Sequence, residues 1–122
     1  MYTRGIRGAT TVNIDTPEAI KKATIELFDE IINVNEINYE DISHIIFTMT
    51  SDLKSAYPAK FVREHFNLKY VPLACMNELE IENSLKKCIR ILIVVNTNKS
   101  QSEIKHIYLA GAKTLRKDLQ EN

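Results

Sequence analysis

The sequence predicts an α+β domain in which two main helices cover one face of a mixed five-stranded sheet. Three observations support this class. Strand-like and helix-like segments follow in the order β-α-β-α-β-β-β, and two helical segments are long enough to cover a sheet. In addition, residues 88–95 (CIRILIVV) are apolar on both faces of a strand. The 122 residues fit one domain, residues 1–122, with a C-terminal tail from about residue 112 that we expect to be mobile.

The first predicted strand and helix occupy the N-terminal part of the chain. Residues 2–14 are rich in β-branched side chains, which favours a strand. A helix is predicted to begin at Pro17, because Thr16 is a good N-cap and Glu18 suits the positive end of the helix dipole. One apolar stripe indicates that this helix covers a core. The residues of the stripe are Ile20, Ala23, Leu27, Phe28 and Ile31.

The remaining elements follow in order along the chain. Residues 42–50 read as a second strand, and a second helix is predicted to begin near Pro58. Its side chains predicted to face inward are Phe61, Val62, His65 and Phe66. The later predicted elements are a short third strand at 70–76, a fourth at 88–95, a turn into a short fifth strand within 100–110, and a turn or helix at 111–119.

The fourth predicted strand requires a partner beyond the two helices. Its odd-numbered side chains from Ile89 to Val95 are all aliphatic, and Leu92 and Val94 lie beside Arg90 on the other face. Two helices can cover only one face of such a sheet, so we expect a second copy of the chain to cover the other. The pattern therefore predicts an obligate homo-oligomer.

Composition and charge exclude several classes of protein. Sixteen basic and sixteen acidic residues give a formal net charge of zero, unlike a nucleic-acid binder with its basic excess. No stretch approaches the length of a membrane span, and the first residues do not resemble a signal peptide. Two cysteines, Cys75 and Cys88, are too few for a disulfide framework. We expect a cytoplasmic protein with neither nucleic acid nor membrane as a partner.

Arg90 is the most informative charged residue. A permanent charge in an apolar strand is costly unless an anion meets it. That anion is either a glutamate in a structural ion pair or a bound ligand, and the residues alone leave both possibilities open. Glu78 follows a predicted strand end, where it suits a general base, a hydrogen-bond acceptor or the partner of Arg90.

The other candidates are weaker when taken singly. Arg7 lies in the glycine-flanked motif RGIRG, and Lys60 and Arg63 share one helix face. Cys75 lacks an evident base, the three histidines lack metal-ligand spacing, and Tyr108 suits either the core or a ligand contact. This arginine-rich set without a nucleophile suits a dianionic small molecule. Any catalysis would rest on positioning and fixed charge.

Five stretches taken in order resemble the AroH-type monofunctional chorismate mutases. They are RGIRGATTV, PAKFVRE, YVPLACMNELEI, LKKCIRI and HIYLAGAKTLRKDL. The resemblance covers nearly the whole chain and implies the rearrangement of chorismate to prephenate, on the route to phenylalanine and tyrosine. It also implies a homotrimer whose sheets pack into a pseudo-barrel, with active sites at the subunit interfaces and no cofactor or metal.

The resemblance also assigns roles to the charged residues. Arg90 would donate a hydrogen bond to the ether oxygen of the breaking bond and touch a carboxylate of the substrate. Arg7 would bind a carboxylate, helped by the Tyr108 hydroxyl. Glu78 and Cys75 would hold the ring hydroxyl of the reactive conformer. Arg90, Glu78 and Arg7 are thus the predicted catalytic residues.

A second group would line the pocket or its rim, much of it supplied by the neighbouring subunit. Its members are Tyr57, Ala59, Lys60, Arg63, Ala74, Met76, Asn77 and Leu115. Arg116 belongs to the tail that we expect to order over the ligand. The chain departs from the family pattern at Tyr57, where phenylalanine is usual, and at Ala74, where threonine is usual. It also departs at residues 83–84, where glycine is expected, and at Lys117, which replaces a proline.

Two other functions fit the same residues less fully. A non-catalytic oligomer could bind an aromatic-pathway dicarboxylate without converting it. A purely structural role would pair Arg90 with Glu78 and predict that Glu78→Gln destabilises the protein. The enzyme hypothesis is preferred because it alone requires the complete set of charges.

Overall fold

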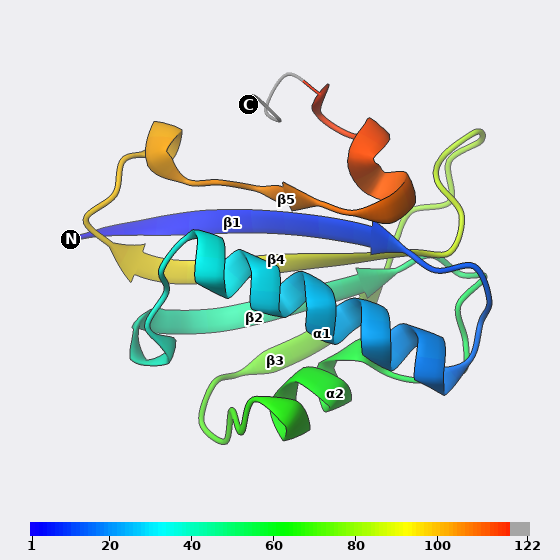
Figure 1. The fold of residues 1–122 in the computed structure, drawn as a ribbon, viewed down its shortest axis with the longest axis horizontal. Coiled ribbons are helices and arrows are strands. Elements are labelled where there is room, and N and C mark those ends of the chain that lie inside the picture. The colour runs from blue at the N-terminus through cyan, green and yellow to red at the C-terminus, as the bar shows by residue number, and fades with distance from the viewer. Residues whose placement is uncertain (118–122) are drawn as a thin grey trace.

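A computed structural model describes residues 1–117 of the chain, with ten elements of secondary structure (Figure 1). The strands are β1 (Tyr2–Thr11), β2 (Ile42–Met49), β3 (Leu73–Asn77), β4 (Cys88–Thr97) and β5 (Ile107–Tyr108). The helices are α1 (Pro17–Val34) and α2 (Pro58–His65), with short 3-10 helices η1 (Tyr39–Asp41), η2 (Gln101–Glu103) and η3 (Ala110–Thr114). The predicted order of strands and helices is confirmed.

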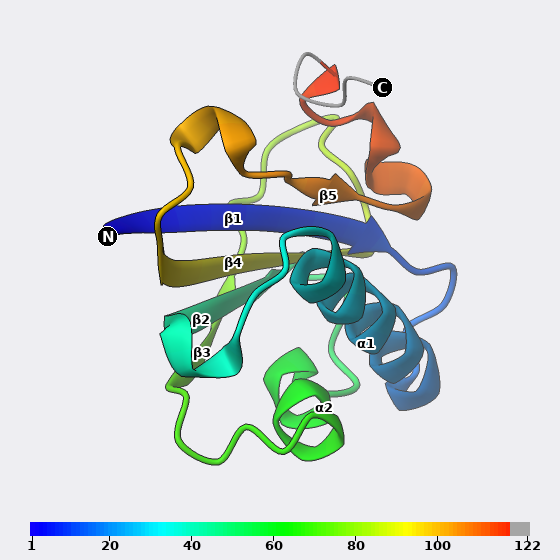
Figure 2. The ribbon, with the colours of Figure 1, turned by 60° about the vertical axis from the view of Figure 1, so that its left-hand side comes forward.

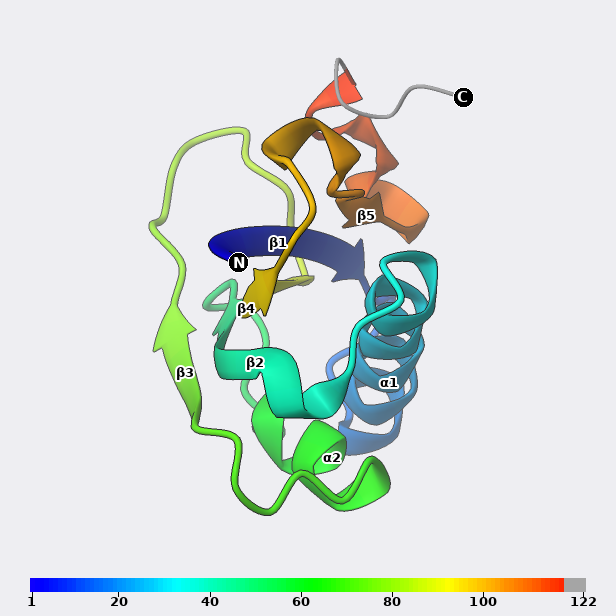
Figure 3. The same cartoon turned by 90° about the vertical axis from the view of Figure 1, so that its left-hand side faces the viewer.

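The strands form a mixed five-stranded sheet in the order β3-β2-β4-β1-β5. The central strand β4 is antiparallel to both β1 and β2, whereas the edge strands β5 and β3 run parallel to their neighbours. Both helices lie on one side of this sheet, and the segment between β3 and β4 runs on the other side (Figure 3). The predicted α+β class with two helices on one face is therefore confirmed.

Local signals set the start of α1. The hydroxyl of Thr16 accepts a hydrogen bond from the backbone N–H of Ala19 at 3.1 Å, and Pro17 occupies the first turn. The stripe packs against β1 so closely that a Cβ at Gly8 would lie 2.5 Å from the Cδ1 of Ile31. A larger residue at this position would displace the side chains of Ile31 and Leu27, so glycine lets the helix pack close to the sheet.

The core lies between the helices and the sheet. Ile89, Ile91, Ile93 and Val95 are buried on the helix side of β4. On its other side, which we call the open face, Arg90, Leu92 and Val94 are only half-buried. The alternation predicted for this strand is thus correct, and from Ile89 to Val95 the described part of one chain fully buries only the helix side.

Several boundaries and one orientation differ from the prediction. β1 ends at Thr11 rather than residue 14, because its partner β4 begins at Cys88, opposite Thr11, and the ladder adds only the bond from the Val12 N–H to the Lys87 carbonyl. β3 begins at Leu73 rather than residue 70, directly after Pro72, which has no N–H to donate. His65 is exposed rather than inward-facing, since α2 ends there.

The C-terminal segment departs from β5 at the β1 edge of the sheet (Figures 1 and 2). The turn or helix predicted at residues 111–119 corresponds to η3, which ends at Thr114, and residues 118–119 lie outside the described part. Of the tail predicted to be mobile, about residues 112–122, residues 118–122 lie outside the described part. Among residues 1–117, no helix is both long and apolar enough to cross a membrane.

Candidate active site

The sheet register brings side chains from all five strands into one row on the open face. Arg90 pairs with Ala9 of β1 on one side and with Thr48 of β2 on the other. The row continues to Tyr108 of β5 beyond Ala9 and to Met76 of β3 beyond Thr48. Directly paired residues project from the same face of a sheet, so the arginine lies among side chains far apart in the sequence.

Arg90 forms an ion pair with Glu78 at the end of β3. The Nε of Arg90 lies 2.9 Å from the Oε1 of Glu78, and the hydroxyl of Thr48 donates to the same oxygen at 2.8 Å. The backbone N–H of Glu78 donates to the carbonyl of Met49, which fixes this residue beside β2. The carboxylate side chain is 12% exposed and the arginine side chain is 40% exposed. Glu78 therefore orients Arg90, while part of the arginine side chain remains accessible.

Cys88 lies two residues before Arg90 and on the same face of β4. Its thiol is buried, and burial, followed by the nearby Glu78 carboxylate, raises its pKa from 9.0 to about 11. The thiol is consequently neutral at physiological pH and is a poor nucleophile. Cys88 and Thr48 were not among the predicted site residues. The two-residue spacing from Arg90 could have indicated Cys88, whereas Thr48 is found only once the register of β2 against β4 is known.

Arg7 and Tyr108 meet at the other end of the same face. The Nη2 of Arg7 lies 3.5 Å from the Tyr108 hydroxyl, a long hydrogen bond between β1 and β5. The Arg7 residue is exposed, whereas Tyr108 is buried and packs with Ala9, Cys88 and Ala112. This places an exposed cation against a buried tyrosine, next to the row that contains Arg90.

The residues predicted to line the pocket divide into two groups. Ala74 and Met76 project from the open face of β3, and Leu115 packs against the cluster that contains Tyr108. Cys75 pairs with the core residue Phe47, so its side chain projects from the opposite face to Arg90. Asn77 is exposed at the end of β3.

The second group, which we call the α2 group, consists of the predicted pocket residues in or just before α2 and lies on the helix side of the sheet. Tyr57, Lys60 and Arg63 are exposed there, and Ala59 is buried in the core between α2 and the sheet. One chain thus does not bring this group to Arg90. Arg116 lies after η3, near enough to His106 for its charge to act on that imidazole.

A cavity of about 260 Å³ lies beside the ion pair, between the end of β2 and the loop from Glu78 to Lys86. In this loop Glu80 accepts a hydrogen bond from Ser51, and Leu79 and Ile81 are exposed. Asn83 has a φ of 64°, a left-handed conformation that asparagine tolerates better than most residues. Asparagine at this expected glycine position therefore fits the backbone.

The arrangement provides hydrogen-bond donors and positive charge on one face of the sheet. Arg90 and Arg7 project from one face, and each is held by an oxygen of the same chain. Within residues 1–117, no three His, Cys, Asp or Glu side chains are grouped so as to hold a metal ion. Two guanidinium groups on one face suit a ligand with two carboxylates.

Comparisons with known proteins agree over nearly the whole chain. A family model described as chorismate mutase type I matches residues 3–119. The protein named chorismate mutase AroH from Bacillus subtilis (strain 168) is 44% identical over 119 residues, which is 98% of this chain and 94% of the relative. The protein of the same name from Thermus thermophilus is 45% identical over 118 residues, 96% of both chains.

A solved structure shows the same fold. It is the chorismate mutase from Clostridium thermocellum, which superposes with a TM-score of 0.89 at 45% sequence identity. The match covers 92% of this chain and 99% of that one.

Proposed function

The chain belongs to the type I chorismate mutase family, and from this premise we propose that it rearranges chorismate to prephenate, on the route to phenylalanine and tyrosine. The observation that carries the proposal is the Arg90–Glu78 pair on the open face, with Arg7 and Tyr108 beside it. All four residues belong to the set that the family resemblance implies, and the fold places them on one side of the sheet.

The reaction needs no nucleophile, which fits this set of side chains. An ether bond breaks within one molecule as a carbon–carbon bond forms, and negative charge grows on the ether oxygen. A donor held at that oxygen stabilises the transition state more than the substrate, and this difference accelerates the reaction. We assign this role to Arg90, because its planar guanidinium can donate to the ether oxygen and a carboxylate together.

Glu78 then has two roles. Its ion pair with Nε orients the Arg90 guanidinium, and its carboxylate would accept a hydrogen bond from the ring hydroxyl of chorismate. Thr48 supports both roles because it holds the same carboxylate oxygen at 2.8 Å. Arg7 would bind a substrate carboxylate, with Tyr108 limiting the directions in which its guanidinium can point. These fixed positions reduce the reorganisation needed in the transition state.

We propose that a homotrimer completes each site with residues of a neighbouring subunit. Leu92, Val94 and Ile46 leave half-buried apolar surface on the open face, which packing against another subunit would bury. The exposed α2 group, Tyr57, Lys60 and Arg63, lies on the opposite side of its own sheet. A neighbouring subunit would therefore supply this group to each site, and the three sheets would pack as a pseudo-barrel. We place this enzyme in the cytoplasm, because two cysteines are too few for a disulfide framework.

The test is the loss of chorismate ultraviolet absorbance on addition of purified protein, with the product identified as prephenate. Rapid loss that scales with enzyme concentration is expected. Binding of chorismate without loss of absorbance would instead identify the protein as a non-catalytic dicarboxylate-binding module. A folded oligomer that neither binds nor converts chorismate would leave the Arg90–Glu78 pair with a structural role alone.

A further inference from the structure

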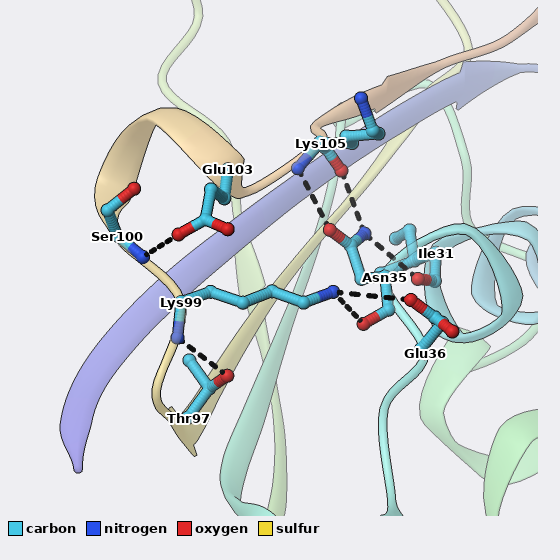
Figure 4. A network of polar contacts seen from close by, with 8 residues as sticks. All are labelled: Ile31, Asn35, Glu36, Thr97, Lys99, Ser100, Glu103 and Lys105. Carbon is cyan, nitrogen blue, oxygen red and sulfur yellow. Dashed lines mark hydrogen bonds and ion pairs between the residues drawn. The ribbon is translucent and has the colours of Figure 1, made fainter.

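The residues just before β5 lie outside the sheet, and the buried side chain of Asn35 holds them in that position. β5 pairs with β1 only at Gly8↔Ile107 and Ala9↔Tyr108. His106 directly precedes β5, and Lys105 precedes His106. The backbone N–H and the carbonyl of Lys105 both bind the side chain of Asn35. The Oδ1 of Asn35 accepts from the Lys105 N–H, and its Nδ2 donates to the Lys105 carbonyl, each at 2.8 Å (Figure 4).

Because of this path, β1 lacks a backbone carbonyl as hydrogen-bond acceptor next to Arg7, and the side chain of His106 takes its place. The Lys105 carbonyl is turned to Asn35, at the end of α1, rather than to β1. The backbone N–H of Arg7 donates instead to the Nδ1 of His106 at 3.0 Å. A backbone N–H can only donate, so Nδ1 must carry a lone pair and the imidazole must be neutral, with its proton on Nε2.

We propose that His106 is a positioning residue for Arg7. Its imidazole extends the β1–β5 ladder by one hydrogen bond and fixes the β1 backbone at the residue whose guanidinium meets Tyr108. Without this acceptor the edge of β1 at Arg7 would lack a partner on the β5 side. Since Arg7 is the residue assigned to a substrate carboxylate, this inference rests on the proposed function.

The surroundings of His106 favour the neutral imidazole that this contact requires. Burial, then the charges of Arg7 on β1 and Arg116 after η3, hold its pKa below the ordinary 6.5. Arg4 lines a cavity that borders His106, and the Glu103 carboxylate of η2 is bound to the N–H of Ser100. Both charges that act on the pKa of the imidazole are therefore positive.

A proton can nevertheless reach the ring at lower pH. A cavity of about 190 Å³ borders His106, lined by Thr3, Arg4, Gly5, Gln101 and Ile104. Protonation would turn Nδ1 into a donor that faces the Arg7 N–H, and would add a positive charge beside the Arg7 guanidinium. The positioning of Arg7 should therefore be intact above the lowered pKa and lost as the pH falls through it.

Two variants separate an acceptor role from simple packing. His106→Asn keeps an acceptor oxygen near the position of Nδ1 but does not titrate, whereas His106→Leu keeps the bulk and removes the acceptor. Arg7 binds a carboxylate that is present in both substrate and transition state, so the loss should appear mainly in KM. We expect His106→Leu to raise KM for chorismate about 10- to 100-fold with little change in kcat. His106→Asn should stay close to the wild type.

The pH profile provides the second readout. Wild-type kcat/KM should fall on the acid side of pH 6.5, and the His106→Asn profile should be flat over the same range. His65→Asn is the matched control, because His65 is exposed at the end of α2, and this variant should retain the wild-type profile. An unchanged KM in a folded His106→Leu protein, or the same acid limb in His106→Asn, would overturn the proposal.

An NMR titration of the wild type separates this inference from the proposed function. The amide nitrogen of Arg7 should shift with pH at the same midpoint as the His106 ring, whether or not the protein converts chorismate. A responsive Arg7 amide in a protein without mutase activity would overturn the proposed function and leave the contact standing. An Arg7 amide that is silent through the His106 titration would overturn the contact itself.

Discussion

The Nε of Arg90 and the Oε1 of Glu78 lie 2.9 Å apart, although one residue is in the middle of the sheet and the other follows an edge strand. The pair joins β4 to the end of β3 across β2, and the Thr48 hydroxyl of β2 holds the shared oxygen. The structure thus contains the ion pair that a structural role would require. It also leaves 40% of the Arg90 side chain exposed, which a ligand-binding role requires.

Replacement of Arg90 by lysine should separate fold from catalysis. Lysine keeps the positive charge, but it cannot donate to the ether oxygen, a carboxylate and Glu78 from one rigid plane. We expect a folded protein whose kcat falls by a factor equivalent to about 3–4 kcal/mol or more, the cost of losing an oxyanion-type donor. The measurement is the rate of chorismate loss, with circular dichroism to check the fold.

Arg4→Lys is the matched control for this change. Arg4 lies on β1 and donates through Nε to the carbonyl of Lys99. The same substitution there removes a guanidinium that does not contact Arg90 or Glu78. Near-normal turnover by folded Arg90→Lys protein, or an equal loss in Arg4→Lys, would contradict the role given to Arg90.

Glu78→Gln tests whether the ion pair serves mainly stability or activity. Glutamine keeps an oxygen that can accept from Thr48, but it removes the charge that orients Arg90. Because the arginine is partly exposed, we expect the free energy of unfolding to change by less than about 1 kcal/mol. Activity should fall by about 100-fold, since the donor is no longer aimed. A loss of several kcal/mol in urea denaturation, with activity retained in the folded fraction, would favour the purely structural role.

The sequence predicts the elements of this fold better than their ends and contacts. Thr16, Pro17 and Pro58 locate both helix starts because caps and proline act locally. The end of β1 differs from the prediction because it depends on where the partner strand β4 begins, at Cys88 opposite Thr11. His65 was placed inward by helical periodicity, which does not show that the helix stops at that residue.

In the candidate site, too, residues with a local sequence signal could be predicted, whereas residues defined by distant contacts could not. Arg90 was recognisable because a charge interrupts an apolar strand, and Glu78 because it follows a strand end. Thr48 and His106 give no such signal. Each becomes meaningful only through register, which places Thr48 opposite Arg90 and His106 beside Arg7. The alternating pattern of a strand fixes which face is buried, but it does not show which residue of a distant strand lies opposite.

Leu92→Asp should test the proposed oligomer. Leu92 is half-buried on the open face of β4, where a charge would be tolerated by one chain but not within a subunit interface. We expect a folded monomer in sedimentation, with mutase activity lost because no neighbour supplies Tyr57, Lys60 and Arg63. Lys22→Asp, on the exposed side of α1, should remain wild-type in both assays. An active Leu92→Asp trimer would show that the open face is not the interface.

The two cysteines should react very differently with a thiol reagent. Cys75 is exposed on the edge strand, whereas Cys88 is buried with its pKa raised to about 11 by desolvation and by Glu78. The thiolate is the reactive form, so native protein at pH 8 should release one equivalent of chromophore per chain, and unfolded protein two. Cys75→Ser should abolish the native reaction, and Cys88→Ser should leave it. Rapid labelling of Cys88 in the native protein would contradict its burial.

Asn35→Ala should destabilise the fold through the Lys105 segment. The Asn35 side chain is buried and makes three hydrogen bonds, two with the backbone of Lys105 and one to the carbonyl of Ile31 (Figure 4). Alanine leaves the Lys105 groups without these partners, so the free energy of unfolding should fall by on the order of 3 kcal/mol. Asn33→Ala, on the exposed side of the same helix, should change it by less than about 0.5 kcal/mol.

The same Asn35→Ala variant links stability to the site. Lys105 precedes His106, so release of this segment should also loosen the acceptor of the Arg7 N–H and raise KM for chorismate, as expected for His106→Leu. Additivity gives a sharper test, because residues that act through one contact should not have independent effects. The double variant Asn35→Ala/His106→Leu should therefore show a KM close to that of His106→Leu alone. A double variant whose KM equals the product of the two single effects would show that Asn35 acts on the site by another route.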